Sequence, residues 1–179
     1  MGHSTRPWDV LVGILKEYAL QAVVDIRRYP SSRRFPHFNR GDMERALPAL
    51  GMEYHWFEAL GGRRNPCSKG FSSPNAGLRS PGFRAYADYM CTEEFRQAVK
   101  GLFDLCAHRT CVLLCAERLY WKCHRRILSD YLTSLGIDIL HIDGLGVCQR
   151  HVVTPGAVLQ TGGGVLYLTS GLPLQGELL

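Results

Sequence analysis

Short apolar runs separated by helical patterns constrain the fold of this chain more than any other feature. Residues 22–26 and 110–115 are rich in β-branched and aliphatic side chains and are too short for helices, and residues 53–57 alternate as a strand does. Helical spacing fills the stretches between them, for example at 92–107. Strands that alternate with helices indicate a parallel sheet with helices on both faces. The sequence therefore predicts an α/β fold: a single three-layer domain with a mostly parallel sheet.

The other expected elements follow from periodicity and from start and stop residues. Pro7 favours a first helical turn, and Gly51 and Gly136 favour helix ends. Two prolines keep residues 27–40 out of a sheet interior. Further helices are expected after Pro7 and at 42–50, 83–90 and 123–135, and further strands at 137–142 and 165–168.

A length of 179 residues suits one domain. We expect it to cover residues 1–155, followed by a Gly-rich tail at 156–179 with one edge strand. No apolar stretch approaches the 18 residues or so of a membrane span, and charged residues interrupt the N-terminal region where a signal peptide needs an apolar core. The seven cysteines are an odd number, which favours free thiols in a reducing compartment. The expected location is cytoplasmic.

Positive charge is concentrated in one third of the chain. Residues 26–87 hold 11 basic and four acidic residues, a net charge of +7, whereas the whole chain has a net charge of +5. A concentrated basic segment is what an anionic partner needs, whether that is a nucleic acid, a nucleotide or a phosphorylated metabolite. The alternative is a solvated surface whose arginines pair with acids elsewhere.

Polar, ionisable or glycine residues follow three of the predicted strands. Ligands of open α/β sheets bind beyond the carboxyl ends of the strands, so these residues predict a site at that edge. The residues in question are Asp25 and Arg27 after the first strand, Gly61, Gly62 and Arg63 after the second, and Cys115, Glu117, Trp121, Cys123, His124 and Arg125 after the third.

The third segment carries most of the chemistry. Cys115 is expected at a strand end and Cys123 at or near the N-terminus of the next helix, where the dipole and nearby basic residues lower the pKa of a thiol. A thiolate at such a place is a nucleophile. The alternative is that both cysteines are small core residues. A metal site is not expected, because the spacing of Cys115, Glu117, Cys123 and His124 is not a familiar zinc pattern, and no cofactor is expected either.

Three further side chains could move protons. Glu117 and His124 are candidate general acid/base groups. Asp25 is either a functional carboxylate or a partner that fixes the loop through Arg27 or Arg125. An exposed glutamate and an ordinary helix N-terminal histidine remain the alternatives for Glu117 and His124.

Arginine and aromatic side chains are interleaved in the predicted loops. Arginines can hold phosphates and aromatic rings can stack on bases. We expect Arg27, Arg63 and Arg125 to bind an anion, and Trp121, which lies in a polar loop, to stack on a base.

Several short segments form a specific set when they are taken together and in order. They are Gly2-His3-Ser4, Asp25-Ile26-Arg27, Pro30-Ser31-Ser32, Phe38-Asn39, Leu60-Gly61-Gly62, Phe83 to Met90, Cys115-Ala116-Glu117 and Cys123-His124-Arg125. With these segments the chain resembles the domain-of-unknown-function family 488 over about residues 2–155. The resemblance implies an α/β domain and no established reaction.

Family members usually have a β-strand before the Gly-His-Ser segment, whereas only Met1 precedes it here. With that strand present, His3 and Ser4 would lie at the same sheet edge as Asp25 and Cys115, and His3 and Ser4 are therefore counted with the anion-binding residues.

A looser likeness is to rhodaneses and related phosphatases. Those domains also carry an Asp-x-Arg sequence after an early strand and place a cysteine at a strand end, where Cys115 stands in this chain. The loop from Cys115 to Arg125 is longer than a compact phosphate-binding loop and lacks glycine, so the likeness is an analogy only.

Two functional hypotheses therefore stand. The first is an enzyme that acts on a nucleotide or nucleic acid through its Cys/His/Glu/Arg residues. The second is a non-catalytic nucleic-acid-binding module that uses the basic segment 26–87. The first needs a thiol of lowered pKa, whereas the second needs salt-dependent affinity and no thiol.

Overall fold

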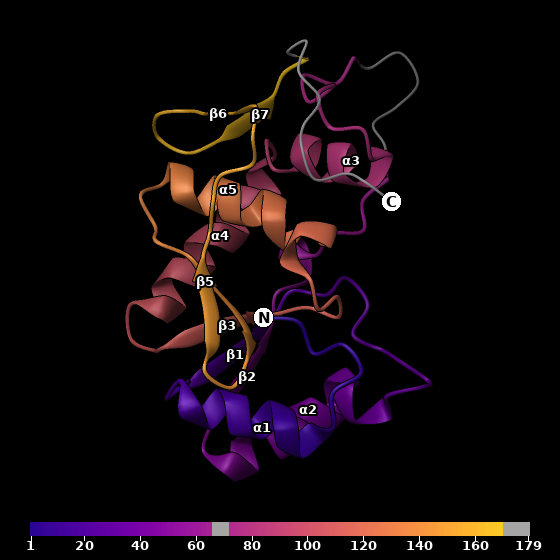
Figure 1. Cartoon of the computed structure of the whole chain (residues 1–179), viewed down its shortest axis with the longest axis vertical. Helices are drawn as coiled ribbons and strands as arrows, with labels where there is room; N and C mark the ends of the chain where they lie inside the picture. The colour runs from indigo at the N-terminus through magenta and orange to yellow at the C-terminus, as the bar shows by residue number, and fades with distance from the viewer. Residues whose placement is uncertain (66–71, 170–179) are drawn as a thin grey trace. The chain divides into compact units, whose positions relative to one another are not determined.

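The computed structural model describes residues 1–65 and 72–169, so Cys67 and Lys69 of the basic segment lie outside the described residues. The chain divides into two compact units made of interleaved segments (Figure 1). The first unit comprises Met1–Gly61, Gln97–Leu119 and Ile142–Cys148, and the second comprises Gly62–Arg96, Tyr120–His141 and the chain from Gln149 onward. The domain boundary near residue 155 stays a prediction.

A three-stranded parallel sheet is the centre of the first unit. Its strands are β1 (Ala22–Asp25), β2 (Glu53–Trp56) and β3 (Cys111–Leu114), in the order β2-β1-β3. Ala22 is level with Glu53 on one side and with Cys111 on the other. The carboxyl ends of all three strands therefore meet at one edge, and the predicted α/β fold is confirmed.

Two helices of the first unit pack on one face of this sheet. They are α1 (Trp8–Glu17) and α2 (Arg40–Ala46). Side chains from both helices share one hydrophobic core with alternate residues of β1 and β3, as the two-residue period of a strand requires. That core includes Leu11, Ile14, Leu15, Val23, Met43, Val112 and Leu114.

The N-terminal residues lie alongside β3. Gly2 forms a parallel bridge with Cys115, and the amide of His3 donates to the carbonyl of Cys115 at 2.8 Å. A single parallel bridge therefore stands where the resemblance leads us to expect a strand. His3 and Ser4 lie at the carboxyl edge of the sheet as a result.

The second unit is built around α3 (Pro81–Tyr89), α5 (Arg125–Ser134) and the first residues of α4 (Glu93–Cys106). The expected strand at 165–168 is β7 (Val165–Tyr167), which pairs antiparallel with β6 (Ala157–Leu159). Tyr86 and Tyr167 are fully buried in this unit.

The helix and strand ends differ from expectation where proline and glycine intervene. The helix expected over 42–50 splits, because Pro48 begins a separate 3-10 turn, Pro48–Leu50. The strand expected at 137–142 is β4 (Leu140–Gly144), which pairs with β5 (Val147–Arg150) and not with the parallel sheet. Gly146, with a φ of 63°, makes the tight turn between them possible.

Short 3-10 turns complete the described elements: Pro36–Phe38, Glu58–Leu60 and Tyr120–Lys122. Within residues 1–65 and 72–169, none of the helices has the length and apolar character needed to cross a membrane.

Candidate functional site

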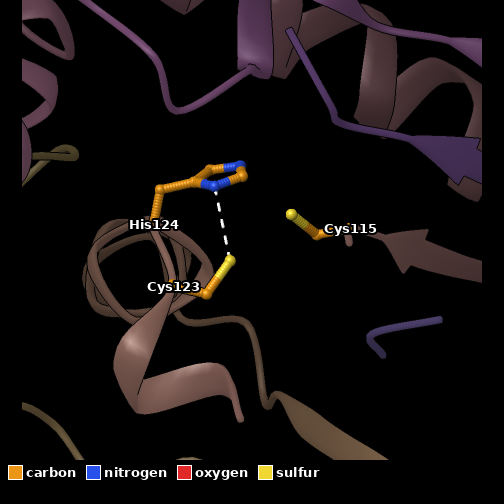
Figure 2. A group of neighbouring side chains, drawn as sticks. All are labelled: Cys115, Cys123 and His124. Atoms are coloured by element: carbon orange, nitrogen blue, oxygen red, sulfur yellow. Dashed lines mark hydrogen bonds between the residues drawn. The ribbon is translucent and has the colours of Figure 1, made fainter. Parts of the chain in front are cut away.

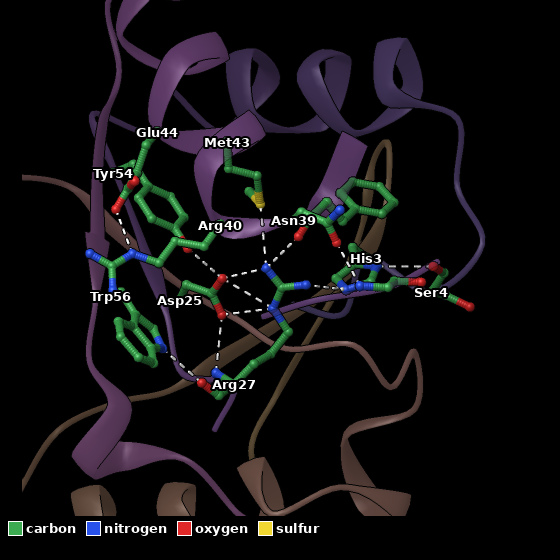
Figure 3. Close-up of polar contacts among 12 residues, drawn as sticks. His3, Ser4, Asp25, Arg27, Asn39, Arg40, Met43, Glu44, Tyr54 and Trp56 are labelled. Carbon is green, nitrogen blue, oxygen red and sulfur yellow. Dashed lines mark hydrogen bonds and ion pairs between the residues drawn. The ribbon is translucent and has the colours of Figure 1, made fainter. Parts of the chain in front are cut away.

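Asp25 and Arg27 form a buried ion pair at the carboxyl end of β1 in the first unit (Figure 3). Asp25 is fully buried and Arg27 is 6% exposed. The backbone amide of Arg27 donates to Asp25 Oδ1 at 3.0 Å, and its Nε donates to the same oxygen at 2.8 Å. One carboxylate therefore fixes both the main chain and the side chain of the residue two positions later.

The N–H groups of the Arg27 guanidinium form hydrogen bonds with other groups of the protein. One terminal nitrogen donates to Asp25 and to the carbonyl of Phe38 at 2.7 Å, and the other lies 3.1 Å from His3 Nε2. This arrangement favours the structural interpretation of Asp25, in which it fixes the loop through Arg27. Anion binding by Arg27 and catalysis by Asp25 stay predictions.

His3 is held in one tautomer by two neighbours. Its Nδ1 lies 2.9 Å from the carbonyl of Ser4, to which it can only donate, so its Nε2 accepts from Arg27. Burial and the charge of Arg27 lower the pKa of His3 to about 4. His3 is therefore neutral at pH 7 and belongs to the same polar network as Asp25.

Sequence reasoning missed one member of this network. The hydroxyl of Tyr54 on β2 donates to Asp25 Oδ2 at 2.7 Å, and burial followed by the charge of Asp25 raises the pKa of Tyr54. The register places Tyr54 level with Val23 on β1, which is two residues before Asp25 and on the same face of the sheet. Strand alternation alone could have indicated Tyr54, because a polar hydroxyl on the core face needs a partner.

The first unit also holds two residues of the third predicted segment. Cys115 directly follows β3 and is buried. Glu117 is exposed, and its Oε1 accepts from the amide of Leu119 at 3.2 Å. A catalytic role for either residue stays a prediction.

Cys123 and His124 lie together in the second unit, just before α5 (Figure 2). The sulfur of Cys123 is 3.4 Å from His124 Nδ1, within hydrogen-bonding distance of a thiol. Cys123 is 5% exposed and His124 is 9% exposed. The helix begins at Arg125, so Cys123 is near its N-terminus, as the sequence predicts.

The imidazole of His124 is held from two sides within the second unit. Gly62 approaches it so closely that a Cβ atom there would lie 2.3 Å from His124 Cγ. On α3, the ring of Tyr86 packs edge-on against it, with ring centres 5.2 Å apart. The Gly-Gly segment and the tyrosine of α3, which are distant in sequence, thus both serve to place this imidazole.

The remaining predicted residues of the second unit have different surroundings. Arg125 is 3% exposed, whereas Arg63 is exposed. Trp121 is 40% exposed and packs edge-on against Tyr120, with ring centres 5.2 Å apart. Trp121 thus has open ring surface, and its role in base stacking stays a prediction.

Two of the predicted residues in the second unit are of types that bind zinc. A zinc site needs four ligands as a rule, and Cys123 and His124 offer two of the preferred type. Cys115 belongs to the first unit, so the second unit does not complete such a set from these predicted residues.

A second polar cluster, which sequence reasoning missed, surrounds Asp130 on α5. Asp130 is fully buried; its Oδ1 accepts from the amide of Thr154 at 2.8 Å and lies 2.9 Å from His151 Nε2. His151 Nδ1 in turn lies 3.0 Å from Nε2 of His141. Burial and the nearby His151 lower the pKa of His141 to about 3. An aspartate within the apolar pattern of a helix was the available signal.

Comparison with known families adds one match. The domain of unknown function DUF488 matches residues 7–132, which include β1, β2, β3, the Cys123–His124 pair and most of α5. Searches of curated proteins and of solved structures found no match. The match spans more than half of the chain and ends within α5, before His141 and His151. The chain therefore belongs to the DUF488 family.

Proposed function

We propose that this chain is an enzyme that acts on an anionic substrate, a nucleotide or nucleic acid, through the thiol of Cys123 with His124 as its base. The observation that carries the proposal is the 3.4 Å approach of Cys123 Sγ to His124 Nδ1. A nucleophilic cysteine needs a base within hydrogen-bonding reach and a third group that orients the base. Gly62 and Tyr86 supply that orientation.

The charges that follow the pair favour an anionic substrate. Arg125 and Arg126 form the first turn of α5 and are both buried, at 3% and 6% exposure. Their positive charge and the amides of the helix N-terminus stabilise a nearby thiolate and attract an anion. Both effects favour the thiolate form of Cys123.

The chemistry then follows in balanced steps. His124 Nδ1 takes the proton of the thiol, and the thiolate attacks an electrophilic atom of the substrate. A bond from sulfur to that atom forms as the bond to the leaving group breaks, and the leaving group takes the proton from the imidazolium. An acceptor nucleophile then takes the group from Cys123: its bond to the group forms as the bond to sulfur breaks, and the imidazole passes the proton of the acceptor back to the thiolate.

The test is alkylation by iodoacetamide across a pH series, read for each cysteine by mass spectrometry. The expected result is that Cys123 reacts with an apparent pKa well below the free-thiol value of about 8.5. A mixture of nucleotides and short oligonucleotides should protect it, and the His124→Asn variant should return the pKa toward the free value. Cys148, which is exposed, is the reference within the same molecule. A Cys123 that is inert at every pH overturns the proposal.

A second candidate function, nucleic-acid binding without catalysis, is favoured by one feature of the first unit. The ring of Tyr29 is 65% exposed in the loop after β1, and Arg33 and Arg34 in the same loop are exposed as well. A binder of this kind should lose affinity steeply as salt rises. Its affinity should survive the Cys123→Ser change, whereas the turnover of an enzyme would not.

A further inference from the structure

A network of hydrogen bonds, buried except at its Asp88 end, joins α5 to α3 within the second unit. The hydroxyl of Tyr167 on β7 donates to Asp130 Oδ2 on α5 at 2.6 Å. The amide of Tyr167 donates to Asn75 Oδ1 at 3.1 Å, and Asn75 Nδ2 donates to Asp88 Oδ1 on α3 at 2.8 Å. Asp130, Tyr167 and Asn75 are all fully buried.

Such a network fixes geometry because water does not reach Asp130, Tyr167 and Asn75 to compete for their hydrogen bonds. Asn75 uses its carbonyl toward β7 and its amide toward α3, so it can satisfy both only at one spacing of the two elements. Asp130 is held equally firmly, because its other oxygen accepts from the amide of Thr154. Satisfied buried networks of this kind rigidify the elements that they connect.

This hydrogen-bond network connects the two helices that hold His124 in place. Helix α5 begins at the residue after His124, and α3 carries Tyr86, whose ring packs edge-on against the imidazole. Asp88, the last member of the network, lies two residues from Tyr86 on the same helix. The spacing of α3 and α5 therefore sets where the Tyr86 ring stands relative to His124.

We infer that Asp130 and Asn75 are positioning residues, which act through Tyr167 to hold the His124 imidazole beside Cys123. This inference rests on the proposed function of the Cys123–His124 pair. It also gives β7 a role in that site, although β7 lies outside the part of the chain that matches the family.

The test compares two tyrosine-to-phenylalanine variants. Tyr167→Phe removes the hydroxyl that reaches Asp130 and keeps the ring. Tyr131→Phe is the matched control. Like Tyr167, Tyr131 is buried; it lies on α5 and packs on Phe95, and it is not part of the hydrogen-bond network described above. Asn75→Asp, which sets a second carboxylate against Asp88, is the second variant in case Tyr167→Phe does not fold.

Two readouts apply to each variant: the pH profile of Cys123 alkylation and the NMR signal of the His124 ring C–H groups, which the Tyr86 ring shifts. Tyr167→Phe should slow Cys123 alkylation at pH 7 at least about threefold, which corresponds to about half a pKa unit, and should move the His124 signal. Tyr131→Phe should leave both close to the values of the unmodified chain.

Two results would count against this account in different ways. A Tyr167→Phe protein with a lower melting temperature but an unchanged Cys123 profile and His124 signal overturns the inference, because the hydrogen-bond network then contributes to stability alone. An inert Cys123 in the unmodified protein overturns the proposed function instead. In that case the His124 signal still decides whether Tyr167 positions the imidazole.

Discussion

Replacing Gly62 by alanine should displace His124 from Cys123. The new Cβ atom would lie 2.3 Å from His124 Cγ and 2.5 Å from His124 Nδ1, whereas ordinary contacts are about 3.4–4 Å. The imidazole, which Tyr86 packs against from α3, would therefore have to move by about 1 Å. Such a shift would lengthen the 3.4 Å approach of Nδ1 to the Cys123 sulfur beyond hydrogen-bonding distance.

The cost in stability follows from the same overlap. Forcing one extra methyl group into a packed site costs about 1–3 kcal/mol. We expect the Gly62→Ala change to lower the free energy of unfolding by that amount in urea titrations. We also expect it to raise the apparent pKa of the Cys123 thiol in the alkylation assay, because the thiolate loses its partner.

Gly82 on α3 is the matched control, since it lies in the same unit and an alanine there meets nothing closer than 3.9 Å. Gly82→Ala should raise stability by about 0.5–1 kcal/mol through helix propensity alone and leave Cys123 unchanged. A Gly62→Ala protein that is as stable as the unmodified chain, with the same alkylation profile, would refute the steric argument.

Three further predictions concern the buried polar groups. Asp25→Asn should cost about 3–5 kcal/mol, because it leaves the charge of Arg27 buried without its partner; a urea midpoint close to that of the unmodified protein would contradict this. Tyr54→Phe should cost about 1–3 kcal/mol, because Asp25 loses a donor, and the same titration measures it. Finally, His141 and His3 are neutral when folded, with pKa values of about 3 and about 4, but titrate near 6.5 when unfolded. Stability should therefore fall as pH drops below about 6.5, by up to about 1.4 kcal/mol per pH unit for each histidine, and urea midpoints that stay level down to about pH 5 would refute this.

The parallel sheet could be predicted because its signal is local. Short apolar runs mark β1 and β3, and alternation marks β2; all three strands begin and end within one residue of expectation. The pairing of β4 with β5 could not be predicted in this way. A turn at Gly146, which has a left-handed φ, returns the chain directly from β4 to β5 with no helix between them. The alternation of helices and strands in the rest of the chain does not predict such a turn.

The residues that hold the candidate site in place are harder to predict from the sequence than Cys123 and His124 themselves. A cysteine next to a histidine stands out by chemical type, so Cys123 and His124 could be singled out from the sequence. The sequence places Gly62 after a strand but does not show that it meets His124, and Asp130 is marked only as an aspartate within the apolar pattern of a helix. Their roles depend on contacts across 62 and 37 residues of sequence, with His124 and with Tyr167.

The polar groups of the two units differ in their hydrogen-bond partners, and this difference distinguishes a structural role from a chemical one. In the first unit, Asp25, Arg27 and His3 satisfy one another, and the donors of Arg27 are directed at protein atoms. A network of that kind holds loops in place. In the second unit, by contrast, a glycine and an aromatic ring hold an imidazole beside a thiol, which is the arrangement that a nucleophilic cysteine needs. For this reason our proposal assigns the chemistry to Cys123 and His124, whereas the contacts of Asp25 and Arg27 favour a structural role for that pair.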